Sequence, residues 1–357
     1  MKKLLTVSFV AFTLIASAQK TPKNVIIMIG DGMGYNTVSL QVLDKKGNSN
    51  FERFNSIGSI KTYSSEGKIT DSAAGGSAFA IGEKTYNGAV GVDVNKQPKK
   101  NLMEIAQENK QATGIVVSCA LTHATPAAFS AHQPNRSMNE AIAADIVTSN
   151  IDILVGGGMK DFNRRKDGRN LISEAEAKGY KVFTDTTSYF TSNGSKAMAI
   201  VAEGHLKQMD KGRGNYLPRA VEKTISLLSQ DKDGFFLMVE GSQIDWAAHG
   251  NNTEYLRAEM EDFDKTIGKV LDFAQKDKNT LVIVLADHDT GGVTLPPASV
   301  NELSEEYGDY IVKYSTGAHA GTLIPVFAYG PGAEKFQGIY QNNEIFSKIM
   351  AIKGWKK

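Results

Sequence analysis

Cysteine is almost absent from this chain of 357 residues, since Cys119 is the only one, and no intrachain disulfide can form. Cys119 lies in the apolar run GIVVSCAL, where we expect a small, buried residue. Disulfides therefore cannot rigidify the fold, and bound metal is one candidate for that role.

An excess of charge of one sign is also lacking. The sequence has 40 basic and 39 acidic residues, which gives a formal net charge of +1. This balance argues against a nucleic-acid-binding surface or a membrane-surface role, because both need a basic face. No proline- or serine-rich linker, low-complexity tract or internal repeat divides the chain. We therefore expect one catalytic domain over residues 19–357.

The apolar run at the N-terminus, Leu4 to Ile15, is too short to span a bilayer. Two lysines precede it and Ala16-Ser17-Ala18 follows it, which is the layout of a secretory signal peptide with a small-residue cleavage site. A buried N-terminal helix is the alternative, but it gives no reason for the paired lysines. We predict that residues 1–18 are a signal peptide and that the protein is exported, to the periplasm or the medium. The residue directly after the predicted cleavage site is Gln19 and not a cysteine, so no lipoprotein-type membrane anchor is expected.

Short apolar segments alternate with segments of helical spacing. The predicted strands are NVIIMI (24–29), TGIVVS (113–118), IDILV (151–155), FFLMV (235–239), TLVIVLA (280–286) and LIPVFAY (323–329). The predicted helices cover residues 101–110, 138–147, 218–230 and 254–276. Nearly continuous apolar strands are typical of parallel strands covered on both faces, so the pattern predicts an α/β fold with a mostly parallel sheet.

Carboxylate, imidazole and hydroxyl side chains follow four of these strands. They are Asp31 after 24–29, His123 and Thr125 after 113–118, Glu240, Asp245 and His249 after 235–239, and Asp287 and His288 after 280–286. A lone aspartate in such a place is usually a turn or cap residue. Because open α/β sheets bind ligands beyond the carboxyl ends of their strands, four such ends together indicate one site.

The donors in this set suit metal ions. Asp31, Glu240 and the Thr125 hydroxyl suit a hard ion such as magnesium, whereas histidines combined with carboxylates suit zinc. The histidines in these motifs are His249, His288 and His319. A hydrolytic site with several metals is the favoured interpretation.

The segment GKITDSAAGGSAFAIGEKTYNG, residues 67–88, places Ser72 directly ahead of a run of alanine and glycine. Thr, Asp and Ser at such a position most often cap a helix. A serine there is also well placed to meet an anion, because the N-terminus of a helix attracts negative charge and small residues leave room for it. Ser72 is therefore a candidate nucleophile, and the cap does not exclude this role.

Six motifs resemble those of the alkaline phosphatases and follow that family's order. They are MIGDGMG, TDSAAGGSAFAIGEKTYNGAVG, THATPAAFSAHQPNR, VEGSQIDWAAHGNN, LADHDTGG and STGAHAGTLIPVFAYGPGA. The resemblance is chiefly to compact bacterial members with short loops. It implies a three-layer α/β/α sandwich, hydrolysis of small-molecule phosphate monoesters, two zinc ions and one magnesium ion per subunit, and a homodimer as the common assembly.

The same resemblance implies a role for each matching residue. Ser72 matches the phosphorylated serine, and Arg136 matches the arginine that clamps the phosphoryl oxygens. The implied metal ligands are Asp245, His249 and His319 for the first zinc, Asp31, Asp287 and His288 with Ser72 for the second, and Asp31, Thr125 and Glu240 for magnesium.

Two positions vary within the family. His123 stands where some bacterial members have an aspartate beside the magnesium site, and Trp246 stands where others place a lysine or histidine near the phosphate. Neither change removes a direct ligand, but both leave the identity of the third metal open. We expect His132 to be packed or hydrogen-bonded and His205 to be peripheral.

Two alternatives to a phosphomonoesterase remain. A phosphodiesterase or sulfatase would use the same metal core, although Arg136 and the third metal site favour monoesters. A secreted metal- or phosphate-binding protein without turnover would be expected to lack the nucleophile or a ligand, and every matching position is filled.

Overall fold

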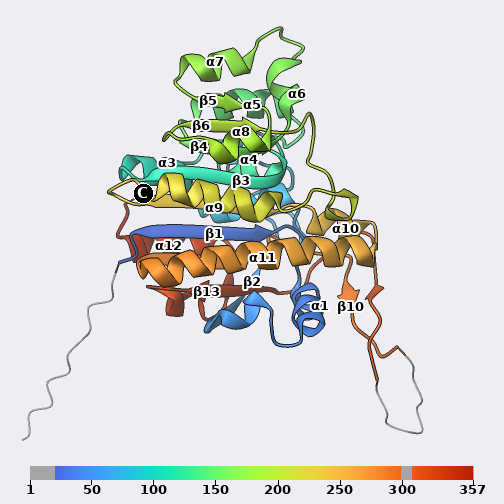
Figure 1. Ribbon diagram of the computed structural model, residues 1–357. Helices are drawn as coiled ribbons and strands as arrows, with labels where there is room; N and C mark the ends of the chain where they lie inside the picture. The colour runs from blue at the N-terminus through green and yellow to red at the C-terminus, as the bar shows by residue number, and fades with distance from the viewer. Residues whose placement is uncertain (1–20, 299–307, 357) are drawn as a thin grey trace, which may run out of the picture.

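The computed structural model describes residues 21–298 and 308–356, and its centre is a ten-stranded sheet (Figure 1). From one edge to the other, the strands are β14 (Gly338–Gln341), β2 (Ser56–Lys61), β13 (Ile324–Tyr329), β8 (Thr280–Leu285), β1 (Asn24–Gly30), β7 (Phe235–Gly241), β3 (Ala112–Ala120), β4 (Ile153–Gly157), β6 (Ala197–Ile200) and β5 (Lys181–Phe183). Strand β13 is antiparallel to both of its neighbours, β2 and β8, and every other pair of neighbours is parallel. The predicted mostly parallel α/β fold is confirmed.

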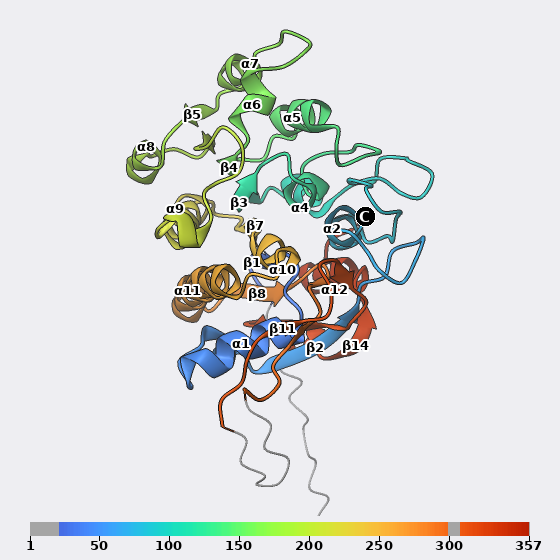
Figure 2. The same cartoon turned by 90° about the vertical axis from the view of Figure 1, so that its right-hand side faces the viewer.

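Helices cover both faces of the sheet, as the predicted three-layer sandwich requires. Figure 2 shows α1, α8, α9 and α11 on one side, and α2, α4, α5 and α12 on the other. The α-helices are α1 (Tyr35–Lys45), α2 (Ser72–Ile81), α3 (Leu102–Glu108), α4 (Ala124–Ala128), α5 (Asn139–Thr148), α6 (Met159–Asn163), α7 (Leu171–Ala177), α8 (Thr186–Thr191), α9 (Tyr216–Leu228), α10 (Ile244–His249), α11 (Thr253–Asp277) and α12 (Glu344–Lys353). Short 3-10 turns are η1 (Asn50–Arg53), η2 (Met209–Lys211) and η3 (Ala333–Phe336).

The predicted strands and helices are all present, with bounds within two residues of the expected ones. Four further strands, β2, β5, β6 and β14, form the two edges of the sheet and were missed. Strands β5 and β14 are short and partly exposed, and β2 alternates between buried and more exposed residues, so these three lack the continuous apolar run by which the inner strands were found. Strand β6 is apolar and buried but has only four residues. Residues 323–329 were grouped with the parallel strands, which is wrong for β13, because an antiparallel strand covered on both faces has the same apolar pattern.

The inner strands hold the site in place because they are rigid. Every residue of β1, β7 and β8 is buried, and their apolar side chains pack against the helices on both faces. Helix α11 packs across this layer, capped at its start by Asn252, whose side chain accepts a hydrogen bond from the Tyr255 N–H. This packing fixes the ends of β1, β7 and β8, where the candidate site residues lie.

Two small antiparallel sheets lie beyond the main one. Strand β9 (Asp289–Thr290) pairs with β12 (His319–Ala320), and β10 (Val293–Thr294) pairs with β11 (Lys313–Tyr314). The first pairing places His319 against Thr290, next to the end of β8. The predicted signal peptide, residues 1–18, lies outside the described residues. Within the described part of the chain, the helices lack the combination of length and apolar character needed to cross a bilayer.

Candidate active site

Four neighbouring strands end at the candidate site. Strands β8, β1, β7 and β3 are adjacent and parallel, so their carboxyl ends share one edge of the sheet. Asp31 follows β1, Glu240 lies near the end of β7, and Asp287 and His288 follow β8. After β3 comes α4, which carries Thr125. All five side chains are fully buried, so the predicted strand-end residues do converge.

Ser72 is the first residue of α2, as the sequence predicted for a helix start. The cap itself is Asp71, whose carboxylate accepts a hydrogen bond from the Ala74 N–H at 2.9 Å. The Ser72 Oγ lies 3.2 Å from His288 Nε2 and 3.4 Å from Asp31 Oδ1. The helix cap and the candidate nucleophile are thus two neighbouring residues.

Two glycines let the backbone approach Asp287. A Cβ atom on Gly75 of α2 would lie 3.0 Å from the Cβ of Asp287. Gly32, at φ +74, donates its N–H to Asp287 Oδ1 at 3.2 Å, and a Cβ there would lie 2.7 Å from Thr290 Oγ1. A side chain at Gly32 would be strained, and one at Gly75 would press on Asp287, so the two glycines let α2 and the turn after β1 lie close to the carboxylate.

Asp245 and His249 lie on one face of α10, which follows β7 at the right-hand end of the sheet in Figure 1. His249 Nε2 lies 3.3 Å from Asp245 Oδ1 and 3.1 Å from His319 Nε2. The Nδ1 atom of His249 lies 2.7 Å from the Gly317 carbonyl oxygen, and that of His319 lies 2.8 Å from the Thr70 carbonyl oxygen. These contacts orient both rings so that their Nε2 atoms face the carboxylate, which is how histidine ligands are held around a metal.

A second group of donors adjoins the first. His288 Nε2 lies 3.5 Å from Asp31 Oδ1 and 3.4 Å from Asp287 Oδ2. The His288 ring stacks on that of His319 at 3.6 Å between centroids. Single ligand atoms of Asp31, Asp287 and His288 lie within 4.8 Å of one another, and the same holds for Asp245, His288 and His319.

The electrostatics of this cluster favour bound cations. Burial, then the charges of Asp287, Asp245 and Glu240, raise the pKa of Asp31 well above its usual value. Burial also raises the pKa of Asp287, and raises that of Glu240 to about 7. Burial and a neighbouring imidazole lower the pKa of His288 to about 3. Several buried carboxylates crowded together without cations are costly, and metal ions would remove that cost.

Unpaired buried oxygens fit the same conclusion. Among the described residues, no hydrogen-bond partner is found for Asp31 Oδ2, Asp287 Oδ2, Glu240 Oε1 or the Thr125 hydroxyl. Buried polar atoms are nearly always satisfied in folded proteins, and oxygen atoms of this kind are the ligands that divalent cations take. The residues present therefore fit the metals that the sequence implies.

Arg136 lies at the rim of this cluster, with 30% of its side chain exposed. One guanidinium nitrogen lies 3.0 Å from Asp71 Oδ2, and the other lies 3.4 Å from His123 Nε2. Asp71 thus both caps α2 and orients the arginine. Sequence analysis missed this second role, because Asp71 and Arg136 are far apart in the chain, and only the TDS motif marked the aspartate.

The structure places Trp246 beside His123 with a ring-centroid separation of 5.6 Å. His205 lies 4.6 Å from Trp246 and 5.6 Å from His123, and its Nδ1 accepts a hydrogen bond from the Ala120 N–H. His205 is exposed, which agrees with its predicted peripheral place, but its ring contacts connect it to the rim of the candidate site. Its loop, outside any recognised motif, folds back onto the end of β3 and forms part of the wall beside Arg136.

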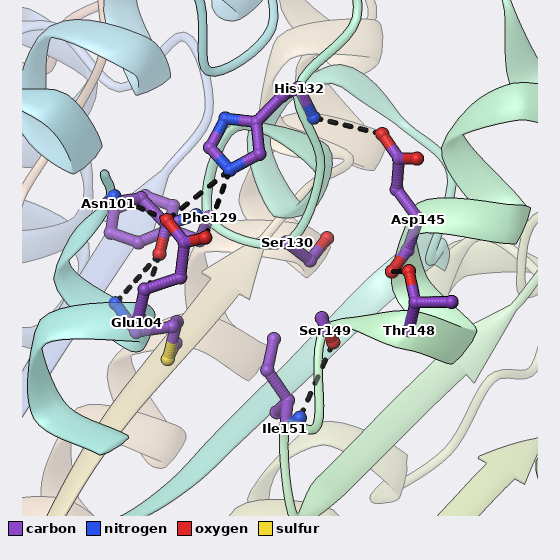
Figure 3. A pocket seen from close by; sticks show the side chains of 10 residues that line it. Asn101, Glu104, Phe129, Ser130, His132, Asp145, Thr148, Ser149 and Ile151 are labelled. Carbon is purple, nitrogen blue, oxygen red and sulfur yellow. Dashed lines mark hydrogen bonds and ion pairs between the residues drawn. The ribbon is translucent and has the colours of Figure 1, made fainter. Parts of the chain in front are cut away.

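His132 lies away from the cluster, next to a cavity of about 200 Å³ (Figure 3). Its Nδ1 lies 2.7 Å from the Gly91 carbonyl oxygen, its Nε2 lies 3.3 Å from Glu104, and its backbone N–H donates to Asp145. The prediction of a hydrogen-bonded rather than a ligating histidine is confirmed. Cys119 is also buried as predicted, but its Sγ lies 3.3 Å from Glu240 Oε2, inside the candidate site.

A hydroxyl within hydrogen-bond distance of buried potential metal ligands fits a metal-dependent hydrolase. A family model described as alkaline phosphatase matches residues 22–308. Alkaline phosphatase 4 of Bacillus subtilis is 35% identical over 423 aligned positions, which cover 94% of this chain and 91% of that one. The chain belongs to the alkaline phosphatase family, and the predicted enzyme class, a phosphate-monoester hydrolase, is confirmed.

Solved structures agree. The alkaline phosphatase of the Antarctic bacterium TAB5 superimposes with a TM-score of 0.91 at 45% identity, covering 95% of this chain and all of that one. A TAB5 variant with an aspartate in place of a histidine was solved with magnesium bound in its M3 site, at a TM-score of 0.90 and 44% identity over 95% of this chain and 100% of that chain. This related structure and the candidate ligand groups described above together support metal binding by this family fold.

Proposed function

We propose that the protein hydrolyses phosphate monoesters through a covalent phosphoserine on Ser72. The observation that carries this proposal is the position of the Ser72 hydroxyl at the start of α2, 3.2 Å from His288 Nε2 and 3.4 Å from Asp31 Oδ1. A hydroxyl between two candidate metal ligands is positioned for activation as an alkoxide, without a separate general base.

We propose that two zinc ions and a third cation, magnesium in the related enzymes, bind in the cluster. The proposed ligands are Asp245, His249 and His319 for the first ion, Asp31, Asp287, His288 and Ser72 for the second, and Asp31, Thr125 and Glu240 for the third. Bound zinc would lower the pKa of a coordinated hydroxyl and neutralise charge on the entering and leaving oxygens. The unpaired oxygens of Asp31, Asp287 and Glu240 support this assignment.

In the first half-reaction, the Ser72 hydroxyl loses its proton to solvent, its oxygen attacks phosphorus, the P–O bond to the alcohol breaks, and the alcohol leaves with a proton from water. In the second, a water oxygen attacks the phosphoserine, inorganic phosphate leaves, and Ser72 regains its proton. The N–H groups at the start of α2 and the positive end of the helix dipole stabilise the phosphoryl anion in both steps. Ala73, Ala74, Gly75 and Gly76 leave this helix end uncrowded.

Arg136 would bind two phosphoryl oxygens through its planar fork, a geometry that lysine cannot reproduce. Its contact with Asp71 holds the guanidinium at the rim before substrate arrives. His123 and Trp246 border this position, and we propose that they shape the substrate entrance and the waters near the third cation. Arg136 and the proposed metal ions together carry the positive charge, and a monoester dianion is the substrate that fits it best.

The test is a comparison of initial hydrolysis rates for an aryl phosphate monoester, its diester and its sulfate analogue. The reactions contain zinc and magnesium at alkaline pH and are repeated after chelation. We expect a strong preference for the monoester, lost with chelator and restored by metal. Preference for the diester or the sulfate would keep the metal core but contradict the substrate class, and metal-independent turnover would contradict the site.

We also propose that residues 1–18 direct export to the periplasm or the medium and that residues 19–357 act as one catalytic domain, assembled as a homodimer. The basis for export is the sequence pattern of lysines, apolar run and Ala16-Ser17-Ala18. Determining the N-terminal sequence of the protein recovered outside the cytoplasm tests the cleavage, which we expect before Gln19. An uncleaved N-terminus on active protein would contradict it.

A further inference from the structure

The only cysteine of the chain lies against the third proposed metal position. Cys119 is fully buried near the end of β3, and its Sγ lies 3.3 Å from Glu240 Oε2 on the neighbouring strand β7. Ligand atoms of Cys119, His123 and Glu240 all lie within 4.8 Å of one another. This group brings a sulfur and a nitrogen donor to a position for which the sequence implied only oxygen ligands.

Unsatisfied atoms accompany the thiol. Glu240 is fully buried, and its Oε1 has no hydrogen-bond partner among the described residues; the same holds for the buried Nδ1 of His123. The hydroxyl of Thr125, the second residue of α4, is likewise unpaired. A lone buried cysteine would need no ligand. Here the thiol lies against Glu240 Oε2, which already accepts a hydrogen bond from the Ser242 hydroxyl, while the other oxygen, Oε1, and the nearby His123 Nδ1 have no partner among the described residues. Two unpaired donors beside a thiol indicate a cation.

The three donors are carried by rigid elements. Strands β3 and β7 are paired in parallel register, with Val117 opposite Glu240, so the backbones on either side of the group are fixed. His123 immediately precedes α4, and its backbone N–H donates to the Ala120 carbonyl oxygen. The donors are therefore held close together without a metal, and little rearrangement is needed to bind one.

The chemistry of the donor set decides which ion binds. Magnesium requires hard oxygen ligands in octahedral geometry, whereas thiolate and imidazole are ligands of zinc and similar borderline metals. We infer that Cys119, His123 and Glu240 make the third position of this chain selective for zinc over magnesium. On binding, the metal replaces the proton of the Cys119 thiol, which is released to solvent. The inference rests on the proposed function, because it specifies the metal at that function's third site.

A single cysteine makes the test direct, since any metal–thiolate signal must come from Cys119. Metal-free protein is titrated with cobalt(II), a spectroscopic substitute for zinc, and the near-ultraviolet sulfur-to-cobalt charge-transfer band is recorded. The matched variant is Cys119→Ser, which keeps a hydroxyl of similar size beside Glu240 but removes the sulfur. Zinc and magnesium are then offered together, and the bound metals are counted by elemental analysis.

We expect a charge-transfer band in the wild-type protein, no band in Cys119→Ser, and three zinc ions per chain in the wild type under competition. In the variant, zinc affinity at the third position should fall at least about tenfold, since even outer-sphere partners are worth that much, and magnesium should replace the third zinc. The wild-type spectrum needs no variant, so the inference stays testable if Cys119→Ser does not fold.

Absence of the band in wild-type protein that binds two zinc ions and one magnesium ion, and hydrolyses the monoester, would overturn the inference and leave the proposed function intact. Absence of both metal binding and hydrolysis would instead contradict the proposed function. The two failures are thus distinguishable in one set of samples.

Discussion

Removing the Asp71 carboxylate should separate the stability of α2 from the orientation of Arg136. Asp71 Oδ1 accepts the Ala74 N–H at 2.9 Å, and Oδ2 accepts the Gly88 N–H at 3.0 Å and contacts Arg136 at 3.0 Å. Asp71→Ala removes all three contacts. Asp71→Asn can keep the cap through its amide oxygen, but it replaces the second oxygen with a donor that faces two other donors.

The magnitude follows from the individual contacts. Loss of a helix cap costs about 0.5–2 kcal/mol, and loss of a hydrogen bond to a charged group costs about 1.5–3 kcal/mol. The partly exposed pair with Arg136 adds roughly 0–1 kcal/mol. We therefore expect Asp71→Ala to lower the free energy of unfolding by about 3 kcal/mol, and Asp71→Asn to lower it by clearly less. In both variants, the unpaired arginine should raise KM for a phosphate monoester about tenfold, the equivalent of about 1.4 kcal/mol.

The assay is urea unfolding of the metal-loaded protein, combined with steady-state kinetics on an aryl phosphate. Arg136→Ala is the control, because it removes the ion pair without touching the cap, and it should raise KM with little effect on unfolding. Equal stability of wild type and Asp71→Ala would refute the cap, and an unchanged KM in both Asp71 variants would refute the orienting role.

Three further predictions concern the metals and pH. Asp245→Ala should remove one zinc ion per chain by elemental analysis; full zinc content would contradict its assignment. Burial raises the pKa of Glu240 from 4.5 to about 7 in the folded state. Metal-free protein should therefore lose unfolding free energy, on the order of 3 kcal/mol, as the pH rises from about 4.5 to about 7, whereas metal-loaded protein should not. Parallel pH profiles of the two forms in thermal unfolding would contradict this prediction. Burial lowers the pKa of His132, but hydrogen bonds to Glu104 and Gly91 outweigh this effect, so the net pKa is raised. The charged imidazole therefore stabilises the folded state at about pH 6, and His132→Gln should destabilise the protein there and not at about pH 9. Equal losses of unfolding free energy at both pH values would refute this prediction.

The strand-end residues could be predicted because a physical rule links them. Buried parallel strands are recognisable by their apolar runs, and their carboxyl ends must share an edge, so Asp31, Glu240 and Asp287 were expected to converge before any contact was known. Their detailed roles came from the resemblance rather than from spacing. The helix at Ser72 was predictable from local capping chemistry alone.

Contacts between distant, unpatterned segments could not be predicted. His205 lies in a loop with no periodicity, and its position against Trp246 depends on how that loop folds back over the end of β3. Cys119 was predictable as buried, but not as a neighbour of Glu240, because that contact depends on the pairing and register of β3 and β7. Strand β2, the second strand from one edge, lacks a continuous apolar run, and it pairs with β13 and β14, which are far away in the sequence.

The most direct test of the central claim is detection of phosphate on Ser72. The metal-loaded enzyme is incubated with inorganic phosphate or a monoester, quenched in acid, and analysed by intact mass and peptide mapping. We predict one phosphoryl group per chain, located on the peptide that contains Ser72 and absent from Ser72→Ala. Turnover of the monoester with no trapped phosphoryl group under any quench condition, or with undiminished activity in Ser72→Ala, would contradict the account.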